Sequence, residues 1–299
     1  MRDPCGRGPR TIGWGMLGAM AVLLFLPFGA ALVKSFQALD LALPVQRGHF
    51  VGLANYRVLL LAEPEFFSSL RATGITLVVA MLQCAIASGL ALWLERLWPR
   101  RLPPFLSLLL IFPLLLSQTV VALMGRLYLN DQVGIAARLL ADIGLVHEAP
   151  LASVTGAVFW ISVLDAWQWV PFLALLFWVC FQAVPQREID AARIDGLSRP
   201  LMLRAVILPR ISGPLGAIVL IRLLEGLRLF DLPNVLTGGG PGTSTLTVSM
   251  YANRLTFAHQ RFGVAAAHMM LIYTLATVLM LPLIYQAGRV RSTLRGEKT

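Results

Sequence analysis

Several apolar runs of this sequence reach the length that crosses a lipid bilayer, and they constrain the fold more than any other feature. A helix needs about 20 mostly apolar residues to span the hydrocarbon core. The mean hydropathy of the chain is +0.74, and only 13% of its residues are charged. The sequence therefore predicts an all-α membrane protein. Its six transmembrane helices are expected at about residues 14–33, 72–94, 105–127, 155–181, 214–230 and 264–285.

The first apolar run follows a basic amino-terminal segment and superficially resembles a secretory signal peptide. A signal peptide has an apolar core of about 7–15 residues, whereas this run covers residues 14–33. We therefore expect a first span that is retained. The predicted organisation is an amino-terminal segment over residues 1–13, a membrane domain over 14–290 and a tail over 291–299.

Basic residues are distributed unevenly between the two sides of the predicted membrane domain. If the amino terminus is cytoplasmic, the inside segments hold fifteen of the 25 Lys and Arg residues, the outside segments hold eight, and two lie in the fifth span. Cytoplasmic loops of membrane proteins are enriched in these residues. The bias predicts that both termini, and the loop over residues 182–212, are cytoplasmic.

The sequence offers little support for catalysis, metal binding or nucleic-acid binding. It contains no G-x-x-x-x-G-K-S/T phosphate-binding loop and no H-E-x-x-H or G-x-S-x-G motif. Its three cysteines suggest no disulfide framework, and its four histidines lack ligand spacing. The net charge of +10 comes without a basic stretch interleaved with aromatic residues. We expect a non-enzymatic chain without a metal or cofactor and without a nucleic-acid partner.

The polar loop between the fourth and fifth predicted spans has the character of a docking surface. Ala191 and Ala192 are small enough to let a helix approach another protein closely. Gly196 supplies the backbone freedom for a bend, and Pro209 is expected to end a second helix. The segment therefore predicts two short helices that meet at an angle.

The spacing in this loop resembles a known family, the inner-membrane permease subunits of bacterial ABC importers. Their pattern is E-A-A, three residues, G, nine residues, I-x-L-P. Here Asp190 stands in place of the usual Glu, and Val206 in place of the usual Ile. The resemblance implies that the loop contains a coupling helix that docks on an ATPase subunit. The implied coupling residues are Asp190, Ala191, Ala192, Asp195, Gly196, Leu208 and Pro209.

A second motif resembles the sugar-type branch of this family. Phe230 and Asp231 precede Leu236 and the sequence T-G-G-G-P-G, as in the F-D-x-x-x-x-L-T-G-G-G-P stretch of those permeases. The resemblance implies the maltose-type architecture in the bacterial cytoplasmic membrane: a second homologous permease, two ATPase subunits that carry ATP and Mg, and an extracytoplasmic solute-binding protein. The chain would form half of the translocation path for a sugar or sugar-like solute. Glycine and proline in such a loop could also simply turn the chain.

The fifth predicted span carries charges that are costly in lipid. Arg222, Glu225 and Arg228 fall on one helical face, so they are expected to face the bundle interior or a watery cavity. They are candidates for the solute path. Equally, Glu225 could form a structural ion pair with one of the two arginines.

Other candidates for the solute path lie in the third and fourth spans. Asp165, Trp167, Gln168 and Trp169 could form a sugar-binding shelf, although tryptophans in membrane helices more often anchor or pack. Gln118 and Arg126 are comparable candidates in the third span. Alternative functions are an importer permease for glycerol phosphate or polyamine, a six-span channel, or a membrane enzyme. The sequence does not name the solute.

Overall fold

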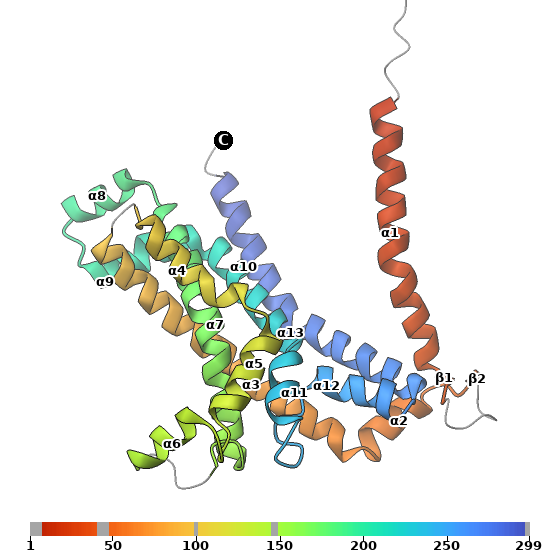
Figure 1. The fold of residues 1–299 in the computed structure, drawn as a ribbon. Coiled ribbons are helices and arrows are strands. Elements are labelled where there is room, and N and C mark those ends of the chain that lie inside the picture. The colour runs from red at the N-terminus through yellow and green to blue at the C-terminus, as the bar shows by residue number, and fades with distance from the viewer. Residues whose placement is uncertain (1–7, 41–47, 99–100, 145–148, 297–299) are drawn as a thin grey trace, which may run out of the picture. The chain divides into compact units, whose positions relative to one another are not determined.

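The computed structural model describes residues 8–40, 48–98, 101–144 and 149–296, and these are helical apart from one short hairpin and connecting loops (Figure 1). Residues 1–7 of the predicted amino-terminal segment and residues 297–299 of the predicted tail lie outside the described residues. The chain divides into two compact units, Met1–Pro64 with Ala252–Thr274, and Glu65–Tyr251 with Leu275–Thr299.

The first unit contains two helices and a hairpin from the amino-terminal part, and elements from the carboxyl-terminal part. They are α1 (Gly8–Ser35), β1 (Gln37–Ala38), β2 (His49–Phe50), α2 (Ala54–Leu61), the π-helical turn η3 (Arg254–Ala258) and the start of α13 (Phe262–Gly296). Strand β1 pairs antiparallel with β2, with Gln37 opposite Phe50.

One asparagine joins the end of α1 to α2 in the first unit. The side-chain amide of Asn55 donates hydrogen bonds to the backbone oxygens of Ser35 and Gln37, at 2.8 and 2.9 Å. The Tyr56 hydroxyl donates to the Ser35 hydroxyl oxygen at 2.8 Å. Carbonyls at a helix end lack partners within the helix, so Asn55 satisfies groups that would otherwise be buried without a hydrogen bond.

The second unit contains most of the chain. Its elements are α3 (Pro64–Leu97), α4 (Pro104–Leu115), α5 (Gln118–Tyr128), α6 (Ile135–Asp142), α7 (Val154–Gln182), α8 (Gln186–Ile194), α9 (Arg199–Met202), the π-helical turn η2 (Leu203–Ile207), α10 (Leu208–Leu227), α11 (Asp231–Thr237), α12 (Val248–Asn253, whose last two residues belong to the first unit) and the rest of α13.

The main core of this unit forms where α3, α7 and α10 pack together. Helix α3 contributes a stripe of small buried side chains, Cys84, Ala87 and Ala91. Helix α7 fills the space opposite with larger residues such as Leu173 and Phe177. Small residues allow close helix approach in a membrane, where packing rather than the hydrophobic effect drives association.

The structure supports five of the six predicted spans, and the sixth depends on how one bent pair of helices is counted. Five helical stretches are long and apolar enough to cross a membrane, and the pair α4 and α5 makes a sixth if it counts as one bent span. The predicted spans 14–33, 72–94, 155–181 and 264–285 fall within α1, α3, α7 and α13, respectively. The chain is therefore a multi-pass membrane protein.

The third predicted span, over residues 105–127, was wrong as a single helix, although the bent pair of helices still counts as one possible span. Helices α4 and α5 are bent by 82° at a break, where Leu116 and Ser117 are extended. Gly125 lets α5 pack closely, because a Cβ there would lie 2.6 Å from Leu164 of α7. Hydropathy averaged over a window does not detect a break whose two sides are both apolar.

The expectation that Pro209 ends a helix was also wrong. Helical structure runs without a break from Arg199 to Leu227, and Pro209 lies in the first turn of α10. The π-helical turn over residues 203–207 directly precedes α10. The wider turn accommodates a residue that lacks an N–H and whose ring crowds the preceding turn. The helix that was predicted to start at residue 214 therefore begins well before it.

Candidate functional site

We call residues 182–212 the coupling loop, after the role that the sequence resemblance implies for them. Helix α8 begins after Pro185 and ends at a left-handed Gly196, with φ +75°. The Gly196 N–H donates to the Arg193 carbonyl, and the Leu197 N–H donates to the Ala192 carbonyl, both at 3.0 Å. This pair of bonds is the Schellman motif, which satisfies the last carbonyls of a helix. Gly196 thus makes the bend that the sequence predicted.

The two alanines of the coupling loop differ in their exposure to solvent. Ala192 is only 5% exposed and packs within the chain, whereas Ala191 is exposed. The neighbouring Ile194 is 86% exposed. Ala191 and Ile194 therefore lie on the exposed side of α8, whereas Ala192 lies on its packed side. Asp190, Asp195, Leu208 and Pro209 are exposed as well.

Ion pairs at the surface connect parts of the coupling loop. Arg210 of α10 donates to Glu188 of α8 at 2.9 Å. Asp190 accepts from Gln186 at 3.0 Å and from Arg193 at 3.3 Å, one turn away on either side. The first pair ties α8 to the start of α10, and the contacts of Asp190 remain within α8.

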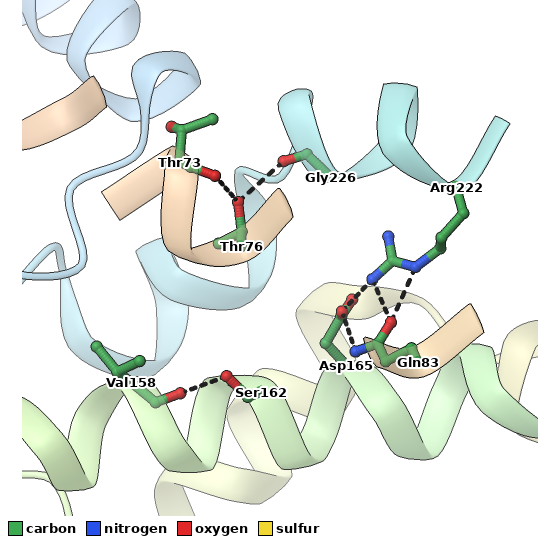
Figure 2. Close-up of polar contacts among 8 residues, drawn as sticks. All are labelled: Thr73, Thr76, Gln83, Val158, Ser162, Asp165, Arg222 and Gly226. Atoms are coloured by element: carbon green, nitrogen blue, oxygen red, sulfur yellow. Dashed lines mark hydrogen bonds and ion pairs between the residues drawn. The ribbon is translucent and has the colours of Figure 1, made fainter. Parts of the chain in front are cut away.

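A polar cluster lies buried among the spans of the second unit, and we call Gln83, Asp165 and Arg222 the buried triad (Figure 2). The three residues come from α3, α7 and α10 and are 1%, 3% and 2% exposed. Gln83 Oε1 accepts from Arg222 Nε at 2.9 Å and from Nη2 at 2.7 Å. Gln83 Nε2 donates to Asp165 Oδ2 at 2.8 Å, and Arg222 Nη2 pairs with the same carboxylate oxygen.

Trp169 is a fourth residue in contact with the buried triad. The Arg222 guanidinium carbon lies 4.8 Å from the centroid of that ring. Asp165 Oδ1 has no hydrogen-bond partner among the described residues. A buried charge is tolerated when it is paired and hydrogen-bonded, and here each charge meets both its counterion and the Gln83 amide. The triad therefore ties three helices together at one point.

The expected ion pair of Glu225 with one of the two arginines of the fifth span forms, and its partner is Arg228. Arg222 pairs with Asp165 rather than with Glu225, because the face of α10 that carries Arg222 is buried in the packing between the helices. Glu225 instead meets Arg228 at 3.2 Å, and the Arg228 side chain is 78% exposed. The three residues differ in burial, since Arg222 is buried, Glu225 is half-buried and Arg228 is exposed. Gln83 was missed, although it is the one amide in the apolar run 72–94.

The proposed four-residue shelf on α7 does not form. Asp165, Gln168 and Trp169 follow helical spacing onto one inward face, whereas Trp167 is 46% exposed. Gln168 Nε2 donates to the carbonyl oxygens of Leu116 at 2.9 Å and Pro113 at 3.4 Å. These carbonyls lie at the break between α4 and α5. Gln168 therefore supplies a partner that the interrupted helix no longer provides.

The remaining candidates lie along α5 and around α11. Gln118 begins α5 and is half-buried, while Arg126 near its other end is exposed. Phe230 is the N-cap residue of α11, and Asp231 is exposed in its first turn. An acidic residue in that position interacts favourably with the helix dipole.

Threonines hold the glycine-rich loop after α11 against the helices. Thr245 Oγ1 donates to the Gly240 carbonyl at 2.9 Å, and Thr247 Oγ1 donates to the Leu229 carbonyl at 2.8 Å. The Val248 N–H donates to Thr73 Oγ1 of α3 at 3.0 Å. Beside this loop, Thr76 also bonds the carbonyls of Thr73 and Gly226 (Figure 2). The loop is therefore fixed in place and not merely a turn.

Two hollows in the second unit are of interest. A small pocket lies between α3, α7 and the loop after α11, and hydroxyl groups such as Thr76, Ser162 and Ser244 line it. A larger groove lies between the end of α3 and the coupling loop. No group of three or more potential metal ligands lies together in the part of the chain that the structure describes. Cys84 and Cys180 are buried and unpaired, and Cys5 lies outside that part.

Comparison with known proteins gives a consistent result. The family described as binding-protein-dependent transport system inner membrane component matches residues 83–289. The probable ABC transporter permease protein YurN of Bacillus subtilis is 30% identical over 80% of this chain and 84% of its own length. The trehalose/maltose transport system permease protein MalF of Thermococcus litoralis is 31% identical over 81% of both chains.

A solved structure shares the fold. It is a bacterial alginate ABC transporter in complex with an alginate pentasaccharide-bound periplasmic protein. The matched chain superposes with a TM-score of 0.77 and 18% sequence identity, and the match covers 93% of this chain and 94% of the other. At that identity the likeness concerns the fold alone.

Proposed function

Because the chain belongs to the family of binding-protein-dependent transport system inner membrane components, we propose that it forms half of the translocation path of an ATP-driven importer for a sugar or sugar-like solute. A family match over residues 83–289 carries this proposal. The name of the trehalose/maltose relative supports the sugar class. The other half of the path belongs to a second, homologous permease subunit.

The energy for import comes from partner subunits in this proposal. The chain is non-catalytic, and two ATPase subunits bind ATP and Mg on the cytoplasmic side. The coupling loop is their docking site, with Ala191 and Ile194 on the exposed face of α8. Asp190, Asp195, Leu208 and Pro209 complete the contact, while Ala192 and Gly196 shape the loop from within. Exposed apolar surface next to charged residues favours such a contact.

The proposed orientation places both termini and the coupling loop in the cytoplasm of a bacterial cell, with the chain in the cytoplasmic membrane. The excess of Lys and Arg on that side supports it. On the other side, the glycine-rich loop after α11 faces a solute-binding protein. Labelling of single cysteines in a background without native cysteines tests this. Gly240→Cys should react with an impermeant reagent in intact cells, and Asp195→Cys should not; the reverse result would overturn the orientation.

The proposed solute path follows α5, α7 and α10. Gln118, Trp167, Glu225 and Arg228 are exposed or half-buried and could contact a solute, and Phe230 with Asp231 flanks the same end of α10. Gln168 and Arg222 are buried, so they act by positioning α7 and α10 rather than by direct contact. A polar lining suits a solute with many hydroxyl groups.

Deletion of the gene and complementation test the function directly. Uptake of labelled trehalose, maltose, glycerol phosphate and a polyamine would be compared in cells with and without the chain. We expect loss of uptake of a sugar. Loss of glycerol phosphate or polyamine uptake alone would replace the sugar assignment, and unchanged uptake of all four solutes with unchanged growth on other sugars would contradict the proposal.

A coupling-loop variant sharpens this test. Proline is restricted to φ near −65°, so Gly196→Pro should abolish uptake while the chain remains inserted. Gly144→Pro is a matched control, since Gly144 also follows a helix end with φ +72° but lies outside the coupling loop. Equal uptake by the two variants would argue against the role of the loop.

A further inference from the structure

The larger groove in the second unit has two kinds of wall, and we call it the basic groove. Arg96, Arg193 and Arg199 line one part, and Leu92, Met202 and Leu203 line another. The cationic part comes from the end of α3 and from the coupling loop. An apolar surface directly beside clustered cations matches an amphipathic, negatively charged molecule.

The charge of the groove is not neutralised by its own acidic residue. Glu95 is the acidic residue in the lining, and its carboxylate accepts a hydrogen bond from Gln182. Arg193 contacts Asp190 at 3.3 Å. Within the described ranges, Arg96 and Arg199 form no ion pair. Two exposed guanidinium groups thus remain available to an anion at the mouth of the groove.

Nearby tryptophans indicate the depth of the groove relative to a bilayer. Trp93 precedes Arg96 by about one turn of α3 and is 54% exposed. Trp98 follows Arg96 and packs against the core. Tryptophan is enriched where lipid headgroups meet the hydrocarbon core. The cationic wall therefore lies at headgroup level, and the apolar wall continues toward the acyl chains.

We propose that the basic groove binds an anionic phospholipid, with its phosphate on Arg96 and Arg199 and an acyl chain along Leu92, Met202 and Leu203. Basic pockets between membrane helices on the cytoplasmic side bind such headgroups. Planar guanidinium groups suit phosphate because they can donate two parallel hydrogen bonds. Assignment of the lipid to the cytoplasmic leaflet rests on the orientation in the proposed function.

Lipid retention by the purified full chain tests the proposal. The chain would be taken from nanodiscs that contain an equimolar mixture of phosphatidylglycerol and phosphatidylcholine, and bound lipids would be counted by native mass spectrometry. We expect selective retention of phosphatidylglycerol. The double variant Arg96→Gln/Arg199→Gln should bind it about twenty-fivefold more weakly, because each cation near an anionic lipid surface contributes about fivefold. Arg204→Gln is the control, since Arg204 is exposed in η2 but does not line the groove.

Three results would overturn the proposal. Equal retention of both lipids would show that charge does not matter, and displacement by inorganic phosphate alone would identify a free-anion site. Unchanged lipid retention by the double variant, together with loss of ATPase co-purification, would show that the groove contacts the ATPase subunit rather than a lipid. Because lipid retention is measured without uptake, it can fail while the proposed transport function stands, and the reverse is equally possible.

Discussion

The buried triad and the ion pairs of the coupling loop both join arginine to carboxylate, but in opposite surroundings. Arg222 and Asp165 have side chains that are 2% and 5% exposed, whereas Arg210 and Glu188 are 37% and 30% exposed. Loss of one partner in a buried pair strands a charge away from water, while the same loss at a surface leaves the other charge hydrated. The same chemistry should therefore stabilise helix packing in one region and contribute little in the other.

The largest effect is expected in the buried triad. Asp165→Ala leaves Arg222 buried without its counterion and should lower the free energy of unfolding by about 3–5 kcal/mol. Thermal unfolding of the purified chain and its abundance in the membrane measure the change. Glu225→Ala is the control, because its partner Arg228 is exposed.

A triple variant separates a structural role of the triad from a role in transport. Gln83→Leu with Asp165→Leu and Arg222→Leu replaces the whole triad by apolar groups, leaves no buried amide without a partner, and should recover most of the stability. Full uptake by this variant would mean that the charges only hold the helices together. Normal abundance with poor uptake would link them to the transport cycle.

Substitutions of the two alanines of the coupling loop should give the next largest change in stability. Ala192→Trp must fit a large ring into a packed site, and overpacking costs about 1–3 kcal/mol. Ala191→Trp lies on the exposed side of α8 and should leave the melting temperature unchanged but weaken co-purification of the ATPase subunit. The idea of separate roles fails if both variants lower stability equally.

The break between α4 and α5 should show a smaller effect. Gln168→Leu removes the hydrogen bond to the Leu116 carbonyl, and the buried acceptor that is left should cost about 1 kcal/mol or slightly more. The change is measured by thermal unfolding, with Gln118→Leu on the neighbouring helix as the comparison. An unchanged melting temperature would mean that the break needs no support from α7.

The smallest effect is expected for the surface pair of the coupling loop. Glu188→Gln should change the free energy of unfolding by less than about 1 kcal/mol, and high salt should reduce even this difference. Unfolding measured at low and high ionic strength checks it. A loss as large as that for Asp165→Ala would remove the distinction between the two regions.

Local signals in the sequence predicted much of the fold and part of the candidate site. Spanning helices follow from apolar runs, because unpaired backbone groups are intolerable in lipid. The turn at Gly196 was predictable from a glycine at a helix end. In contrast, the break at Leu116 and Ser117 lies inside a uniformly apolar run, and nothing in its composition distinguishes it.

The sequence by itself determined the class of protein, the approximate spans and the segment that carries the family pattern. Only the tertiary structure decided which charges meet. Gln83, Asp165 and Arg222 are separated by up to 139 positions along the chain, so no local spacing relates them. Helical periodicity places Arg222 and Glu225 near one another, but the packing of α3, α7 and α10 buries the first and leaves the second near the surface. The physical reason is that burial in a helical bundle depends on which faces pack together, and that depends on the whole set of helices at once.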